Sequence, residues 1–231
     1  MPFMYYFDPT YILVIIGFIF AMMASTGVQS AFNKYSKVKS YRGYTGADAA
    51  RKILDGSGLY NVQIEHISGN LSDHFDPKAN VIRLSDATYS DTSVAAIGVA
   101  AHEAGHAIQH AVGYAPIKVR NAIVPAVNIA STLSMPLFLI GLIMSAPFLT
   151  NLGILLFSGA LVFQVVTLPV EFNASRRAIT ILNESAMLEE DELHGAKKVL
   201  KAAAMTYVAA VISTALQLLR LVLLSNSRRR D

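Results

Sequence analysis

The sequence His102-Glu103-Ala104-Gly105-His106 decides the fold of this chain, and it lies inside a helix-compatible stretch, residues 92–112. Ser90 and Asp91 are suited to cap the start of this helix, and Gly113 to end it. Positions i and i+4 lie one turn apart on the same helical face, so both imidazoles can reach one metal ion. The pattern is typical of HExxH zinc sites, in which the glutamate acts as a general base. The same sequence is also compatible with a buried helix that carries two core histidines, but burying these polar side chains without partners costs free energy.

The composition indicates a membrane protein. Of 231 residues, 53% are hydrophobic and only 15% are charged, which is too apolar for an ordinary soluble domain. The net charge of +3 is small, and the basic residues concentrate near the ends of apolar runs. This placement suits charges that flank a membrane and argues against a nucleic-acid surface. The chain has no cysteine, so any zinc must be held by nitrogen and oxygen ligands.

Four apolar runs predict membrane helices. Tyr11–Val28 is followed, not preceded, by the first basic residues, which indicates an anchor and places the next segment in the cytoplasm. Ile123–Ala146 and Leu152–Val170 are joined by a link without lysine or arginine, and they form a hairpin that returns to the cytoplasm. The last run, 202–224, either spans fully, against the bias set by the basic tail, or is re-entrant or interfacial. Arg220 within it needs an ionic partner.

These runs divide the chain into five predicted segments. They are an N-terminal anchor (1–33), a cytoplasmic insert with the histidine helix (34–120), a transmembrane hairpin (121–171), a cytoplasmic helical segment (172–201), and a C-terminal membrane helix with a basic tail (202–231).

The insert reads as a small α+β unit. Thr45 can cap a short helix over 46–54, and residues 61–67 alternate as a strand should. Turns follow this strand, and a second strand is predicted at 80–85, before the histidine helix. The residues Val81–Ser85 of this second strand either pair within a sheet or bind an extended peptide along the edge of the strand.

A catalytic zinc site usually has three protein ligands, and two residues compete for the third position. His110 lies about 12 Å along the helix axis from His102, too far for imidazole–zinc bonds of about 2 Å. Glu171 is the better candidate, because it follows the hairpin and therefore returns to the side of the histidines. It could instead be a carboxylate that pairs with Arg176 or Arg177 at the membrane surface.

Two further residues could stabilise the oxyanion of a tetrahedral intermediate. His74 lies in a polar loop before the second strand, and Arg176 lies in the segment after the hairpin. The alternatives are a structural turn residue for His74 and an ion pair with Glu184 for Arg176. His66 and His194 are expected at the core or the surface, away from a metal.

Three stretches resemble the YugP-type neutral zinc metallopeptidase family of bacterial membranes: Leu71–Pro77, Ala101–Gln109 and Leu168–Arg177. More distantly, the chain is similar to membrane gluzincins of the HtpX and CAAX-prenyl-protease type, which place HExxH before a transmembrane hairpin and a glutamate ligand after it. Their glutamate motif usually reads E-x-x-x-D, whereas Ser175 holds the last position here. A hydroxyl thus replaces a carboxylate that would orient a ligand histidine, and Asp73 or Asp76 could substitute for it.

We therefore expect a mainly α membrane protein, with three to four transmembrane helices and a small zincin-like α+β cytoplasmic insert. The predicted function is that of a zinc endopeptidase in which His102, His106 and Glu171 hold Zn²⁺ and Glu103 is the general base. As the resemblance also implies, the substrates are membrane or membrane-proximal proteins, cleaved at the cytoplasmic face of the bacterial plasma membrane, with no nucleic-acid partner. The alternatives are a non-catalytic scaffold tied by zinc and a zinc hydrolase of lipids or small amides. Natural substrate, cleavage preference, regulatory partner and oligomeric state leave no mark in the sequence.

Overall fold

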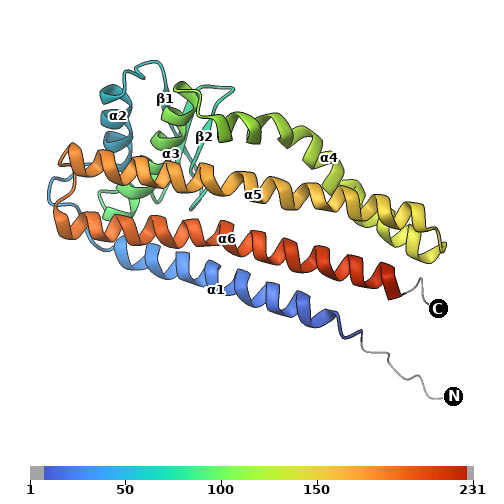
Figure 1. Ribbon diagram of the computed structural model, residues 1–231. Coiled ribbons are helices and arrows are strands. Elements are labelled where there is room, and N and C mark those ends of the chain that lie inside the picture. Colours follow the sequence, from blue (N-terminus) through green and yellow to red (C-terminus); the bar gives the residue numbers. More distant parts are fainter. Residues whose placement is uncertain (1–7, 228–231) are drawn as a thin grey trace. The chain divides into compact units, whose positions relative to one another are not determined.

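The computed structural model describes residues 8–227, and this part of the chain is mainly helical (Figure 1). The helices are α1 (Tyr11–Tyr35), α2 (Gly46–Gly56), α3 (Val94–Ala111), α4 (Ala115–Ile143), α5 (Pro147–Glu184) and α6 (Glu190–Ser227). The strands are β1 (Gln63–Ile67), β2 (His74–Asp76) and β3 (Val81–Ser85). This architecture confirms the predicted fold class, a mainly α protein with a small α+β insert.

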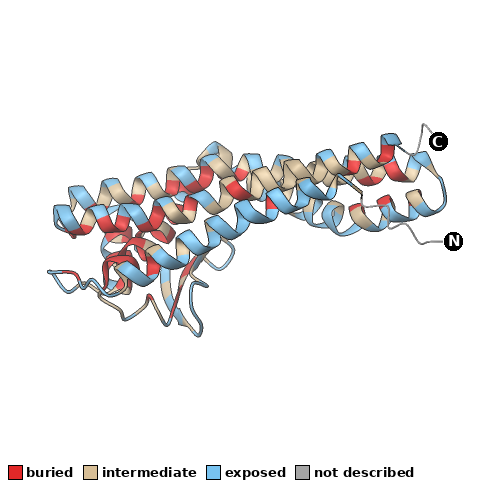
Figure 2. Cartoon of the chain, turned by 90° about the horizontal axis from the view of Figure 1, so that it is seen from below, coloured by how far each residue is buried: buried red, intermediate tan, exposed pale blue. Residues whose placement is uncertain are grey.

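Four of the described helices, α1, α4, α5 and α6, are long and apolar enough to cross a membrane. In Figure 2 exposed residues dominate α1, as expected of a helix whose apolar side chains face lipid. α6 has 38 residues, more than the roughly 20 that a span requires, so its length favours the fully spanning alternative for the last apolar run. The basic tail residues Arg228–Arg230 lie outside the described part.

The insert forms largely as its local sequence predicts. Thr45 caps α2: its Oγ1 accepts from the Asp48 amide at 3.1 Å, and the Asp48 carboxylate accepts from the Thr45 amide at 3.0 Å. Such a capping box satisfies two amides that no helical carbonyl can reach. α3 starts two to three residues later than predicted, because Ser93 is its N-cap and accepts from the Ala96 amide.

The three-stranded sheet has the order β1-β3-β2, with β1 parallel and β2 antiparallel to β3. β3 is therefore the central strand and has no free edge, so the expectation that Val81–Ser85 binds a peptide along its edge is wrong. The alternative, ordinary sheet pairing, holds. β2 was predicted only as part of a loop and turn, because three residues are too few to show an alternating pattern. It forms the edge of the sheet next to α3.

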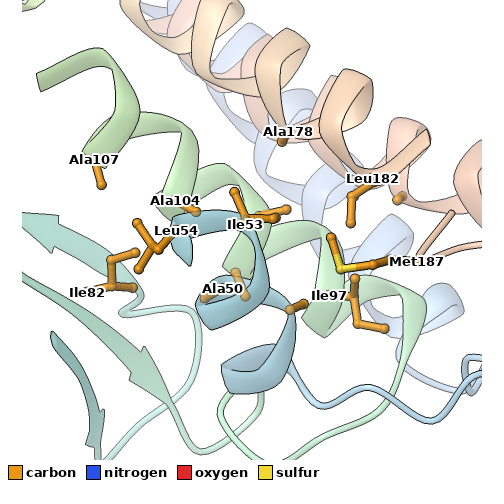
Figure 3. Packing of buried hydrophobic residues seen from close by; sticks show 14 of the residues in the cluster. Ala50, Ile53, Leu54, Ile82, Ile97, Ala104, Ala107, Ala178, Leu182 and Met187 are labelled. Carbon is orange, nitrogen blue, oxygen red and sulfur yellow. The ribbon is translucent and has the colours of Figure 1, made fainter. Parts of the chain in front are cut away.

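The hydrophobic core of the insert packs around α3. Figure 3 shows the resulting core, in which side chains of α2, β3, α3 and α5 and of the α5–α6 turn meet. Its buried members include Ile53 and Leu54 of α2, Ile82 of β3, Ile97 and Ala104 of α3, Leu182 of α5 and Met187 of the turn. This core fixes α3, which carries His102 and His106, against α5.

The chain divides into two compact units that share the long helices. Among the described residues, one unit contains 8–23, 122–166 and 208–227, and the other contains 24–121 and 167–207. In the first unit, Arg220 has the partner that its place in an apolar run demands. Its Nη2 lies 3.3 Å from the Asp8 carboxylate, and its guanidinium lies 4.2 Å from the centre of the Tyr11 ring. The second unit holds the α+β insert and every residue of the predicted site.

Candidate metal centre

Three side chains of the second unit converge on one point. His102 and His106 extend from one face of α3, and their rings stand nearly perpendicular, with centroids 4.6 Å apart. Glu171 reaches them from α5. The distances are 3.1 Å between the two Nε2 atoms, and 3.2 and 3.5 Å from Glu171 Oε2 to Nε2 of His102 and His106. The side chains are 14%, 11% and 3% exposed, so this cluster is almost enclosed.

This triangle of atoms fits a zinc ion. Tetrahedral zinc with bonds of about 2.0–2.1 Å places neighbouring ligand atoms about 3.3 Å apart, which lies within the spacing of 3.1–3.5 Å found here. Two imidazole nitrogens and one carboxylate oxygen are ordinary zinc ligands, and they form one group that could hold a metal ion. The structure thus brings together the three residues that the sequence singles out as ligands.

The ligand rings are held from behind by hydrogen bonds. Gln109 is fully buried, and its Oε1 lies 3.0 Å from His106 Nδ1. Its Nε2 donates to the Val170 carbonyl at 2.8 Å and to Asn173 Oδ1 at 3.0 Å, both on α5. Such partners at Nδ1 fix the tautomer and orientation that leave Nε2 free for a metal.

Ser175 performs the equivalent task for His102, because its Oγ lies 3.2 Å from His102 Nδ1. The suggestion that Asp73 or Asp76 replaces the missing carboxylate is wrong. Asp73 accepts from the amide and hydroxyl of Ser85, and Asp76 pairs with Arg83. The hydroxyl itself therefore takes the place of the carboxylate.

Gly105, the fourth residue of the HExxH pattern, allows α3 to approach α5. A Cβ atom at this position would lie 2.8 Å from the Ala174 carbonyl oxygen, closer than real side chains come. The glycine therefore sets the spacing that lets Glu171 reach the two histidines.

Glu103 lies beside the triangle without belonging to it. The residue is 8% exposed, and its Oε2 accepts a hydrogen bond from the Phe75 amide of β2 at 2.9 Å. A buried carboxylate with one backbone donor keeps its other oxygen for a small ligand next to the metal position. This position is the one that a general base for an attacking water would occupy.

The protonation of His106 responds to its surroundings. Burial alone would lower the pKa of His106, but the hydrogen bond that the ring donates to the Glu171 carboxylate and the negative charges of Glu103 and Glu171 outweigh burial and raise the pKa above its ordinary value. Because only the neutral imidazole binds a metal, metal binding and protonation compete for this ring.

Two cavities border the cluster within the second unit. The polar one, about 160 Å³, is lined by His74, Arg120, Asn121 and Tyr207 together with the ligand residues. Arg120 and Tyr207 were not predicted as site residues, because their only signal in the sequence is a polar group inside or next to an apolar run. Arg176 is exposed and lines neither cavity.

The remaining histidines lie away from the cluster. His110 is exposed near the end of α3, and its ring packs at a tilt against that of Phe75, with centroids 5.9 Å apart. Its place outside the cluster agrees with its distance along the helix axis from His102. His66 pairs with Asp86 on the surface, and His194 is exposed on α6. Both agree with their expected places.

Comparison with known proteins points in the same direction as the geometry. A family model described as "Putative neutral zinc metallopeptidase" matches residues 10–226. A relative from Bacillus subtilis (strain 168), named "Putative membrane protease YugP", is 47% identical over 215 residues, which cover 90% of this chain and 96% of the relative. No solved structure matches the chain significantly. The similarity therefore spans the membrane helices as well as the residues of the cluster.

Proposed function

The chain belongs to the "putative neutral zinc metallopeptidase" family, and from this premise we propose that it is a membrane-embedded zinc endopeptidase. One observation carries the proposal: the buried Glu103 carboxylate lies beside a triangle of two histidines and one glutamate. A set of three ligands leaves a fourth tetrahedral position open, which distinguishes catalytic zinc sites from structural ones.

Each residue has a defined role. His102, His106 and Glu171 hold zinc, which when bound supplies Lewis acidity that activates water and polarises a carbonyl. Glu103 takes a proton from the attacking water and delivers it to the leaving amine. The Phe75 amide holds Glu103 in place for both transfers.

The developing oxyanion needs a donor or a positive charge from the chain. Arg120, Tyr207 and His74 line the polar cavity next to the cluster, so we assign this role to them. The exposed side chain of Arg176, the other residue predicted for it, does not line that cavity.

The charge distribution supports a site on the cytoplasmic side of the bacterial plasma membrane. Basic residues gather at the end of α1, with Lys34 in its last turn and Lys37 and Lys39 just after it, whereas the α4–α5 link at 144–146 has none. Positive residues favour the cytoplasmic side of a membrane helix, so both α3 and the start of α6 belong there. Substrates that meet this site are membrane proteins or their membrane-proximal segments.

Two other functions are alternatives to a protease: a zinc-tied scaffold and a zinc hydrolase of lipids or small amides. A zinc-tied scaffold needs no base, and the placement of Glu103 beside the open position argues against it. A zinc hydrolase of lipids or small amides would use the same groups, so substrate tests must separate it from a protease.

The test compares zinc content and cleavage of casein and of lipid amides by the detergent-solubilised full chain. Glu103→Gln should keep about one zinc per chain and lose cleavage, because only the base is removed. Glu171→Ala should lose zinc, whereas Glu184→Ala, an exposed glutamate at the end of the same helix, should behave as the wild type.

Normal zinc binding by Glu171→Ala would overturn the ligand assignment. A wild-type protein that holds zinc and cleaves lipid amides but not casein would replace the protease by the lipid hydrolase.

A further inference from the structure

The second cavity beside the cluster is lined mainly by apolar side chains, and this lining bears on which peptides the site accepts. We propose that it is the subsite that admits an aliphatic side chain of the substrate next to the scissile bond. The proposal rests on the proposed function and names the class of peptide that this site selects.

The cavity has a volume of about 200 Å³ and lies within the second unit. Its apolar walls come mainly from α1, α3 and α6, with Leu71 added from the β1–β2 loop, and they include Val28, Phe32, Val99, Leu200 and Ala203. None of these side chains carries a charge or a hydrogen-bonding group. A substrate side chain that enters therefore exchanges water for hydrocarbon contacts, which favours aliphatic groups.

The cavity opens directly on the reacting groups. His102, Glu103, Glu171 and Tyr207 line both this cavity and the polar one. A peptide bond held at the shared residues thus has an apolar pocket on one side and a charged one, with Arg120, on the other.

Charged side chains are excluded for a second reason. Three carboxylates line the cavity: Glu103, Glu171 and Asp73. Asp73 belongs neither to the proposed ligands nor to the base, and it already accepts hydrogen bonds from the amide and hydroxyl of Ser85 at 2.8 and 3.0 Å. A substrate lysine or arginine would bury its charge among apolar walls, with Asp73 already engaged. Burial without a free partner is costly.

The walls also indicate where such substrates come from. Both α1 and α6 are helices that can span the membrane, and their residues form two of the walls. Segments rich in leucine, isoleucine and valine are what a membrane protein presents at this level. The subsite therefore suits aliphatic membrane-proximal sequence better than a polar, soluble loop.

The test measures binding, so that it does not depend on cleavage. Acylated leucine and glycine hydroxamates, which differ in one isobutyl group, are titrated into the zinc-loaded full chain in detergent by calorimetry. The wild type should bind the leucine compound about tenfold to a hundredfold more tightly, from burial of the isobutyl group.

Two variants fill the cavity from opposite walls: Ala203→Leu on α6 and Val28→Phe on α1. Either should abolish the preference for the leucine compound and leave binding of the glycine compound unchanged. The matched control is Ala202→Leu, whose residue is next to Ala203 but outside the cavity lining, and it should keep the preference. Two filling variants guard against one that fails to fold.

The proposal is overturned if the wild type binds both compounds equally, or if both filling variants keep the full preference. Casein cleavage is measured in parallel on the same preparations. A protein that shows the preference and cleaves nothing retains the subsite and loses the proposed function, whereas cleavage without the preference does the reverse.

Discussion

Replacing Gln109 by methionine tests whether the hydrogen bonds behind the cluster hold it in shape. Methionine has nearly the same length and fits a buried position, but it cannot accept the proton on His106 Nδ1 or donate to α5. Asn173 keeps Arg177 as a donor at 2.8 Å, so the main loss falls on His106.

The magnitude follows from that single orphaned donor. A buried donor without a partner costs about 1–3 kcal/mol. Loss of a hydrogen bond behind a metal ligand typically weakens metal binding about 10–100-fold, or about 1.4–2.8 kcal/mol, so the two estimates agree. We therefore expect zinc affinity to fall by this factor in Gln109→Met.

The assay is competition for zinc between the detergent-solubilised chain and a chromophoric chelator near neutral pH. Gln63→Met is the control, because Gln63 is an exposed glutamine on β1. If Gln109→Met folds and binds zinc as tightly as the wild type, Gln109 does not orient His106 and the reasoning fails.

Three further predictions follow from the same unit. Arg120→Ala should lower kcat about 10²–10³-fold with unchanged zinc content, as loss of an oxyanion partner does, whereas Arg176→Ala should leave kcat unchanged; equal effects would contradict the assignment. Gly105→Ala should weaken zinc binding in the chelator assay, because its Cβ would lie 2.8 Å from Ala174 O, whereas Gly27→Ala meets nothing within 4 Å and should be neutral. The hydrogen bond from Arg83 and the amides of Ala79 and Lys78 lower the pKa of Asp76 from 3.8 to about 2. A lowered carboxyl pKa adds stability that is present above the ordinary pKa and lost as the pH falls through the folded one. The free energy of unfolding of the wild type, measured with urea, should therefore decrease as the pH falls from 3.8 to about 2, and Asp76→Asn should lack this dependence.

The sequence predicts the parts of the site that depend on local geometry. His102 and His106 follow from helical periodicity, and Glu171 from the argument that an even number of crossings returns the chain to the same side. Helix α2 follows from the cap at Thr45. These predictions rest on neighbouring residues in the sequence or on counting membrane crossings, and none of them requires knowledge of tertiary packing.

What sequence reasoning missed depends on contacts across the fold. Arg120 and Tyr207 reach the cluster only because α4 begins, and α6 runs, beside α3 and α5 in one unit. The backbone amide of Phe75, which holds Glu103, has no sequence signature at all. Gln109 is the exception, because its spacing of three from His106 was visible and could have marked it as a partner of that ring.

Glu171, the proposed third ligand, lies within α5 and is separated from the histidines of α3 by α4 and the first part of α5. A ribosome makes α3 well before α5, so a growing chain first carries two histidines and a base with nothing to complete them. The set is complete only after α4 and this part of α5 have been synthesised. Under the proposed function, a nascent or prematurely terminated chain would therefore lack a complete set of zinc ligands, and hydrolysis would require that α5 has been synthesised and packed against α3.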